Sequence, residues 1–188
     1  DKIMRLPNEV KAAMKVAACF GSHCDGSLLR LVESGAVAEV TDVSDGGASV
    51  DEGGAGEPEL IRMLEFAIHE GLMDKVGPVF RFSHDQIQLA AYSLIPELKR
   101  GAWHLRLGDL LLENASPSVL EEMLFVVVDQ LNRGRALIED DVDKRLDLAK
   151  LNMRAGKKAI SSATFTSAAS YLKEGILLLP PNHWNDDY

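Results

Sequence analysis

Apolar residues recur at intervals of three and four along most of the chain, which is the spacing of an amphipathic helix. The first such segment covers Pro7–Cys19, and a proline suits the first turn of a helix. A second segment starts after Asp25, which can cap it, and is expected to end at Gly35. A third segment, Pro58–Glu70, carries a continuous apolar stripe. The N-terminal part of the chain is therefore predicted to be helical.

The helical pattern changes after Glu70. Leu72–Lys75 and Val79–Phe82 are short, and the turn residues Gly77 and Pro78 lie between them. This arrangement predicts a β-hairpin. Helices followed by a hairpin give the element order of a winged helix, so we expect residues 1–96 to form a winged-helix subdomain.

From Ser83 onward the pattern is helical again. Ser83 is expected to cap a helix that stops at Pro96, and Ser116 is expected to cap another that continues as one helix to Leu131. The β-prone run Leu124–Val128 lies between charged residues, which favours a buried helix over a strand. The other predicted helices are one around Leu105–Leu111, one over Asp141–Ile160 and one over Ala163–Leu179.

The last two predicted helices have the spacing of a tetratricopeptide-type hairpin. Gly156 falls where they first cross, and Ala168 and Gly175 fall where they pack closely. Antiparallel helices approach closely only where one partner is small. We therefore expect a mainly α protein in which residues 97–188 form an α-hairpin, TPR-like array. Because one repeat cannot bury both of its faces, further repeats are expected beyond Tyr188.

The segment Thr41–Glu57 interrupts the helical pattern with Gly, Asp and Ser residues. Its low apolar content predicts a flexible loop. Interpretation as a calcium loop is less favoured, because Val43 would stand at a position where calcium needs an oxygen ligand.

The charge and the cysteine content limit which binding partners and which cellular compartment are expected. A formal net charge of −9 argues against nucleic acid, which requires a concentrated basic surface. No apolar run reaches the ~18 residues that span a membrane. Two cysteines, Cys19 and Cys24, make no disulfide framework, which favours the reducing cytoplasm. With His23 between them they still lack a second ligand pair, so no metal site is expected.

Sequence motifs for catalysis are missing, so the chain is expected not to be an enzyme. There is no phosphate-binding loop and no nucleophile elbow, and His84-Asp85 lacks the downstream Asn of a kinase catalytic loop. The basic residues Lys150, Arg154, Lys157 and Lys158 fall on adjacent turns of one helix. A solvated helix face is the favoured interpretation, and a surface for an acidic partner is the alternative.

A family resemblance is carried by Arg81–Pro96, which reads RFSHDQIQLAAYSLIP. This stretch resembles the winged-helix end of the signal-transduction ATPases with numerous domains, and most closely the ATPase region of large serine/threonine and hybrid histidine kinases. The likeness covers roughly the whole chain and continues through His104–Gly108, Leu131–Gly134 and Leu151–Gly156. The loop at Thr41–Glu57 departs from it, and Gln130 stands where the family often has histidine.

The resemblance implies a non-catalytic regulatory or interaction segment of a multidomain ATPase-kinase. This segment would hold no cofactor, ATP or ADP would bind elsewhere in the parent protein, and the partners would be its neighbouring ATPase and kinase domains or proteins bound by the helical repeats. His84 matches a histidine that contacts the β-phosphate of ADP in related switch ATPases. A satisfied structural histidine on the Ile87–Ala91 face is the alternative for this residue.

Two other function classes remain open at this stage. A free-standing helical-repeat scaffold for a peptide or protein would be favoured by an exposed apolar groove between the last helices. An apolar face on the winged helix would favour the ATPase segment instead. A DNA-binding winged helix is least favoured, because its recognition helix would carry Glu57, Glu59, Glu65 and Glu70 against a single Arg62.

Overall fold

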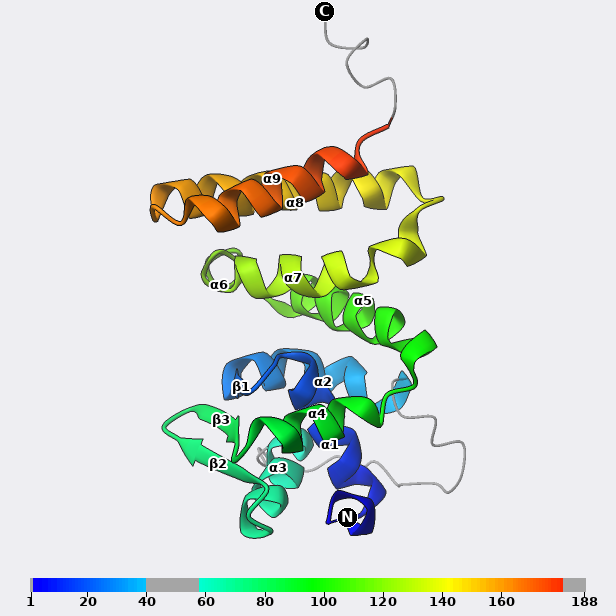
Figure 1. Ribbon diagram of the computed structural model, residues 1–188, viewed down its shortest axis with the longest axis vertical. Helices are drawn as coiled ribbons and strands as arrows, with labels where there is room; N and C mark the ends of the chain where they lie inside the picture. Colours follow the sequence, from blue (N-terminus) through cyan, green and yellow to red (C-terminus); the bar gives the residue numbers. More distant parts are fainter. Residues whose placement is uncertain (1, 40–57, 181–188) are drawn as a thin grey trace, which may run out of the picture. The chain divides into compact units, whose positions relative to one another are not determined.

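The computed structural model describes residues 2–39 and 58–180. The chain divides into two compact units, Asp1–Lys99 and Arg100–Tyr188, hereafter unit 1 and unit 2. Both are mainly helical, and unit 1 also holds a small antiparallel sheet, so the mainly α fold class is confirmed (Figure 1). The expected loop at Thr41–Glu57 lies outside the described residues. None of the helices in the described part is long and apolar enough to cross a membrane.

Unit 1 combines helices with a three-stranded sheet. Its elements are η1 (Ile3–Arg5), α1 (Asn8–Cys19), β1 (His23–Asp25), α2 (Gly26–Glu39), α3 (Glu59–His69), β2 (Met73–Val76), β3 (Val79–Phe82) and α4 (Asp85–Ser93). The strand order is β1-β3-β2 and both pairings are antiparallel. The predicted hairpin is therefore confirmed as β2–β3, and β1 is a strand that the sequence pattern did not predict.

The core of unit 1 forms around α1, which packs against α3 and α4. Val10, Met14 and Ala17 recur at helical spacing on α1 and are almost completely buried. Leu64 of α3 and Phe80 of β3 are also buried, so helices and sheet share one apolar core. The β3–α4 connection, which contains His84, is tied to this unit by the hydrogen bond from the Ser83 N–H to the Leu72 carbonyl.

The observed start of α2 agrees with the prediction from the sequence, and its observed end does not. The Oδ1 atom of Asp25 accepts a hydrogen bond from the Ser27 N–H at 2.7 Å, as a helix-capping residue does. The predicted stop at Gly35 is wrong, because α2 runs through Gly35 to Glu39. An isolated helical glycine costs only about 1 kcal/mol relative to alanine, and the neighbouring alanines favour continuation.

The expected cap of α4 is displaced by one residue. His84 is the N-cap residue, with an extended backbone and a carbonyl that accepts hydrogen bonds from Ile87 and Gln88. Ser83 is held outside the helix because its N–H donates to the Leu72 carbonyl at 3.1 Å. The prediction that Ser83 caps this helix is therefore wrong.

Unit 2 is built from helices alone in the part that the structure describes. Its elements are α5 (Glu97–Asn114), whose first residues belong to unit 1, α6 (Pro117–Glu122), α7 (Leu124–Gly134), η2 (Arg135–Ile138), α8 (Val142–Ser161) and α9 (Phe165–Leu178). The Ser116 side chain accepts a hydrogen bond from Val119 and caps α6, and Asp141 caps α8 through Lys144. Both caps follow the expected helix starts.

The single helix predicted from Ser116 to Leu131 is wrong, because it is broken at Met123 into α6 and α7. α6 buries none of its residues, whereas α7 buries Leu124 and Val128 completely. Because of this break, the β-prone run Leu124–Val128 at the start of α7 faces the core, whereas α6 lies at the surface. The expectation that this run is a buried helix is confirmed.

Glycines bring the helices of unit 2 together. A Cβ atom at Gly156 would lie 2.7 Å from the Leu172 side chain, and one at Gly175 would lie 3.3 Å from the Asn152 Cβ atom. The close approach of α8 and α9 that the sequence predicted is observed at both glycines. In α5 and α7, a Cβ at Gly108 would meet the Leu131 side chain at 2.5 Å. Each helix pair therefore depends on residues without a side chain.

Candidate functional site

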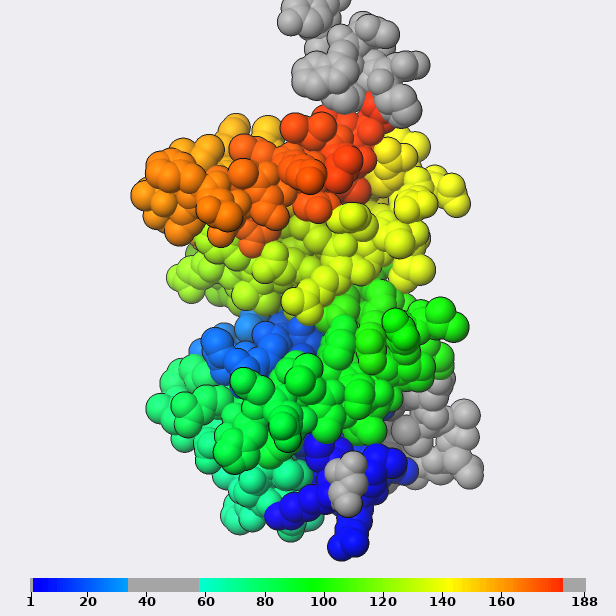
Figure 2. Space-filling view, in the orientation of Figure 1, coloured from blue at the N-terminus to red at the C-terminus, as the bar shows by residue number. Residues whose placement is uncertain are grey.

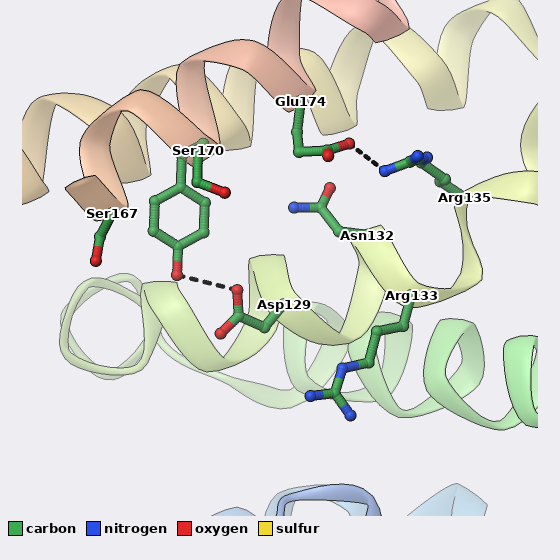
Figure 3. Close-up of a pocket in the computed structure, with 8 residues that line it drawn as sticks. Asp129, Asn132, Arg133, Arg135, Ser167, Ser170 and Glu174 are labelled. Carbon is green, nitrogen blue, oxygen red and sulfur yellow. Dashed lines mark hydrogen bonds and ion pairs between the residues drawn. The ribbon is translucent and has the colours of Figure 1, made fainter.

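A surface groove lies between α7 and α9 in unit 2. Its volume is about 420 Å³, and it extends from α7 onto η2. The residues that line it are Asp129, Asn132, Arg133, Arg135, Ser167, Ser170, Tyr171 and Glu174. Figure 3 shows that α7 and η2 supply one wall and α9 the other. The lining is polar, which makes the groove a candidate site for a hydrogen-bonding ligand.

Two side-chain bridges cross this groove from α9. The Tyr171 hydroxyl donates to Asp129 Oδ1 at 3.0 Å, and Arg135 forms an ion pair with Glu174 (Figure 3). The Tyr171 ring also stacks on Phe125, with ring centroids 5.5 Å apart and an angle of 18° between the planes. The stacking and the hydroxyl hydrogen bond together orient the Tyr171 ring at this end of the groove.

An asparagine pair links α7 to α8 beside the groove. The Asn132 and Asn152 amides each donate to the other's oxygen, at 2.9 and 2.8 Å. Asn152 is completely buried and also donates to the Leu148 carbonyl at 3.0 Å. A buried amide is costly unless its hydrogen bonds are made, so this pair specifies how α7 and α8 pack.

Burial shifts the pKa values of two side chains that line the groove. Burial raises the pKa of Asp129 above its ordinary value, while the Tyr171 hydrogen bond and the Arg133 charge lower it. The pKa of Tyr171 is raised by burial and by the Asp129 charge. At neutral pH the Tyr171 hydroxyl therefore stays protonated and remains a donor. Asp129 and Tyr171 thus offer the groove a hydrogen-bond acceptor and a donor for binding, and neither of them is an activated nucleophile.

A buried histidine lies elsewhere in unit 2. His104 of α5 and Gln130 of α7 are 2% and 3% exposed, and their Nδ1 and Oε1 atoms are 2.7 Å apart. Burial lowers the pKa of His104, with the Arg133 charge in the same direction and the Gln130 hydrogen bond opposing both. His104 is therefore neutral near pH 7 and joins two helices, which is a structural role.

His84, the residue singled out from the sequence, is in unit 1 at the start of α4. Its side chain is exposed and makes no capping hydrogen bond to the helix. The neighbouring Asp85 is an acidic residue in the first turn. Gln88, one turn further along, donates to the Ala18 carbonyl at the end of α1 at 3.0 Å. His84 is thus open to a ligand, on a helix that is tied to the core of unit 1.

Three of the four basic residues singled out on α8 (Lys150, Arg154, Lys157 and Lys158) form ion pairs with acidic neighbours. Lys150 pairs with Asp147 at 2.9 Å, and Arg154 pairs with Glu121 at 3.0 Å. Lys158 also pairs with Glu121 at 3.6 Å. These ion pairs support the interpretation as a solvated helix face over that of a surface for an acidic partner.

The two cysteines are both free and buried. Burial, with the adjacent Asp25 charge, raises the pKa of Cys24 to about 12. Without a bound metal this thiol is therefore protonated at neutral pH. Within residues 2–39 and 58–180, no group of three or more His, Cys, Asp or Glu side chains is placed to hold a metal ion.

Comparison with curated proteins gives one informative similarity. Over 115 residues the chain is 32% identical to hybrid signal transduction histidine kinase G of Dictyostelium discoideum. The match covers 53% of this chain and only 3% of that protein. The chain is thus distantly related in sequence to a small segment of a signal-transduction protein. No protein-family model and no solved structure matches the chain.

Exposed large apolar side chains occur in both units, so they do not separate the two function classes. Leu89 of α4 is 60% exposed in unit 1, and Phe165 of α9 is 67% exposed in unit 2. The groove between α7 and α9 is polar, so it is not the apolar groove expected of a peptide-binding scaffold. The groove residues themselves were missed by sequence reasoning, because Asp129 and Tyr171 are brought together only by the packing of α7 on α9.

Proposed function

We propose that the chain is a non-catalytic regulatory segment of a multidomain signal-transduction ATPase-kinase and relays nucleotide state to neighbouring domains. The similarity to part of a hybrid histidine kinase carries this proposal. ATP or ADP is then a ligand of the larger protein, and the partners are ATPase and kinase domains of the same polypeptide in the cytoplasm. The chain itself supplies contacts and movement, and no reaction step.

The order of helices and strands supports different roles for the two units. In unit 1, helices α1 to α3 precede a β2–β3 hairpin that pairs with β1, which is the order of a winged helix. In unit 2, α8 and α9 form an antiparallel pair with glycine at its contacts, as expected of a TPR-like hairpin. On this proposal unit 1 senses the nucleotide and unit 2 contacts other domains.

His84 is the residue proposed to sense the nucleotide. It is exposed at the N-terminus of α4, where unpaired backbone N–H groups and the helix dipole favour a phosphate. Asp85 opposes this by placing a negative charge in the same turn. A phosphate bound to His84 would be coupled to α1 through the hydrogen bond of Gln88 to Ala18.

The test uses His84→Ala in the full-length protein. A hydrogen bond to a phosphate contributes about 1.5–3 kcal/mol, so ADP affinity should fall about ten- to hundred-fold, measured by calorimetry. His23→Ala is the matched control, because His23 is also exposed and lies on the neighbouring strand β1. Unchanged ADP affinity in His84→Ala, with the fold intact, would show that His84 does not contact the nucleotide.

A scaffold that binds a polar peptide or protein segment is the second candidate function, because the groove between α7 and α9 offers hydrogen-bonding side chains in place of the apolar groove first expected. Ser170 projects into this groove (Figure 3). A Ser170→Arg substitution would fill the groove and should abolish peptide binding while leaving ADP affinity of the full-length protein unchanged. DNA binding is not favoured, because Glu65 of α3 and Glu70, which follows that helix, are partly exposed acidic residues, each paired with one lysine.

A further inference from the structure

Helix α6 is attached to unit 2 with little apolar burial. None of its six residues is fully buried, and its apolar residues Val119 and Leu120 are both partly exposed. Figure 2 shows α6, in yellow-green at the left edge of unit 2, at the surface. Apolar burial is the main force that holds a helix on a domain, so α6 needs other contacts to stay in place.

Charged contacts from α8 reach α6 at one residue. The Glu121 carboxylate lies 3.0 Å from Arg154 Nη2 and 3.6 Å from Lys158 Nζ. Lys158 also donates a hydrogen bond to the Glu121 carbonyl oxygen. Its ammonium group lies 5.5 Å from the centre of the Phe125 ring, which is a favourable cation–π distance. Lys158 of α8 therefore contacts both α6 and α7.

A non-helical residue separates α6 from its neighbours at each end. Ser116 before it is extended, and Met123 after it lies outside the α-helical region. Figure 1 shows α6 end-on beside the start of α7, so the chain changes direction at Met123. The cap bond from the Val119 N–H to the Ser116 hydroxyl is 3.5 Å long, which is weak. Because six residues do not form a stable helix alone in water, α6 unfolds when it leaves α8.

We propose that α6 is a strap, held on α8 by the charge of Glu121, that opens and recloses as a unit while α7, α8 and α9 stay folded. The apolar core that joins α7 to α8, formed by Leu124, Val128 and Ala155, includes no described residue of α6. Opening therefore breaks mainly polar contacts and leaves this core intact. The strap is independent of the nucleotide relay, because it involves no residue of unit 1, so the two proposals fail separately.

Opening of the strap changes the charge on one side of α8. Arg154, Lys157 and Lys158 occupy adjacent turns of that helix, and Glu121 pairs with the first and the last of them while the strap is closed. Once α6 leaves, that carboxylate no longer neutralises these cations. The Glu121 and Arg154 side chains are 53% and 46% exposed, and salt screens exposed ion pairs. Ionic strength is therefore the condition that controls the strap.

The first test is amide hydrogen exchange of the 188-residue chain, followed by NMR at about 0.1 M and about 1 M NaCl, where the Debye length is about 10 Å and about 3 Å. The Leu120 and Met123 N–H groups report on α6, because they donate to the Ser116 and Val119 carbonyls. Their protection, relative to a peptide of residues 115–123 at the same salt concentration, should fall about two- to fivefold at high salt. Protection of the α8 amides should change less.

Two neighbouring carboxylates in the last turn of α6 allow a matched comparison. Glu121→Gln should lower the protection of α6 at low salt to the wild-type value at high salt. Glu122→Gln should leave it unchanged, because Glu122 is exposed and makes no ion pair within the part of the chain that the structure describes. From the α8 side, Arg154→Gln should weaken α6 in the same way. Lys150→Gln should not, because Lys150 pairs with Asp147 of its own helix.

The second test exchanges the charges. Glu121→Arg should open α6, and adding Arg154→Glu should restore its protection by about twofold or more, because the ion pair is rebuilt in reverse. Circular dichroism establishes that each variant is folded, as expected for exposed positions. Equal protection of α6 in Glu121→Gln and Glu122→Gln would overturn the proposal. So would loss of protection in α6 and α8 by the same factor, because α6 would then not open separately.

Discussion

Gly134 of α7 lies directly against Leu105 of α5. A Cβ atom at position 134 would come within 2.6 Å of the Leu105 Cβ atom and 2.8 Å of the Gly101 carbonyl oxygen. Real Cβ atoms do not approach backbone atoms this closely, so the α5–α7 contact exists only because residue 134 has no side chain. This contact holds the N-terminal helix pair of unit 2 together.

Gly134→Ala is therefore expected to destabilise the protein by about 1–3 kcal/mol, because backbone atoms must move apart. Gly101→Ala is the matched control. Its nearest neighbour would be Leu137 at 3.7 Å, and alanine is the better helix former by about 1 kcal/mol, so this variant should be slightly stabilised. Urea unfolding monitored by circular dichroism measures both. A Gly134→Ala variant as stable as wild type would contradict the packing described here.

The buried pair His104–Gln130 makes stability depend on pH. Because burial lowers the pKa of His104 from 6.5, the unfolded chain binds a proton more readily than the folded chain. The contribution of His104 to the free energy of unfolding should therefore be constant above about pH 6.5, the pKa of histidine in the unfolded chain. As the pH falls from about 6.5 to the lowered pKa of the folded state, the free energy of unfolding should decrease. His104→Gln can still bond to Gln130 but does not titrate. Urea unfolding at pH 7.5 and 5.5 should show a smaller pH effect in that variant, and an equal effect would assign the dependence to other groups.

Tyr171→Phe should keep the ring stacked on Phe125 and lose the hydrogen bond to Asp129. The exposed Asp129 carboxylate then has one partner fewer but can bind water, so the loss is expected to destabilise unit 2 by only about 0.5–1 kcal/mol. The pKa of Asp129 should rise further, because the tyrosine bond lowers it. An NMR titration reports this pKa, and thermal unfolding reports the stability. In Asp129→Asn the added Tyr171→Phe change should cost less, since the charged acceptor is gone.

The isolated chain is expected to show no ATPase or kinase turnover, because its sequence has no phosphate-binding loop and no kinase catalytic motif. The measurement is phosphate release at high protein concentration across successive purification steps. Hydrolysis that co-purifies with the chain and disappears in a point variant such as Asp129→Asn would reveal a catalytic centre and would contradict the proposed regulatory role.

The sequence predicted the helices well because their apolar stripes are long and periodic. It also placed Gly156 and Gly175 at the α8–α9 contact, since small residues at helical spacing indicate where two helices approach closely. It missed β1, because His23–Asp25 is too short to show alternation and becomes a strand only by pairing with β3. The break at Met123 was missed for a similar reason, since it follows from what α7 must bury.

The two candidate sites differ in whether the sequence alone could identify them. His84 was identified on a local motif, and the structure adds that it is exposed and stands at the N-cap position of α4. The groove between α7 and α9 has no sequence signal, because Asp129 and Tyr171 are ordinary surface types that tertiary packing brings within 3.0 Å. Periodicity identifies what each helix buries, but it does not identify which polar side chains meet across two helices.

The burial of Cys19 and Cys24 has a practical consequence for spectroscopy. These are the two cysteines of the chain, both are buried, and the raised pKa keeps Cys24 in the unreactive thiol form. Maleimide dyes and nitroxide labels react with exposed thiolates, so a cysteine introduced on the surface of α4 or α9 can be labelled selectively without first removing the native pair. The natural sequence is thus a ready background for fluorescence and electron-spin distance measurements.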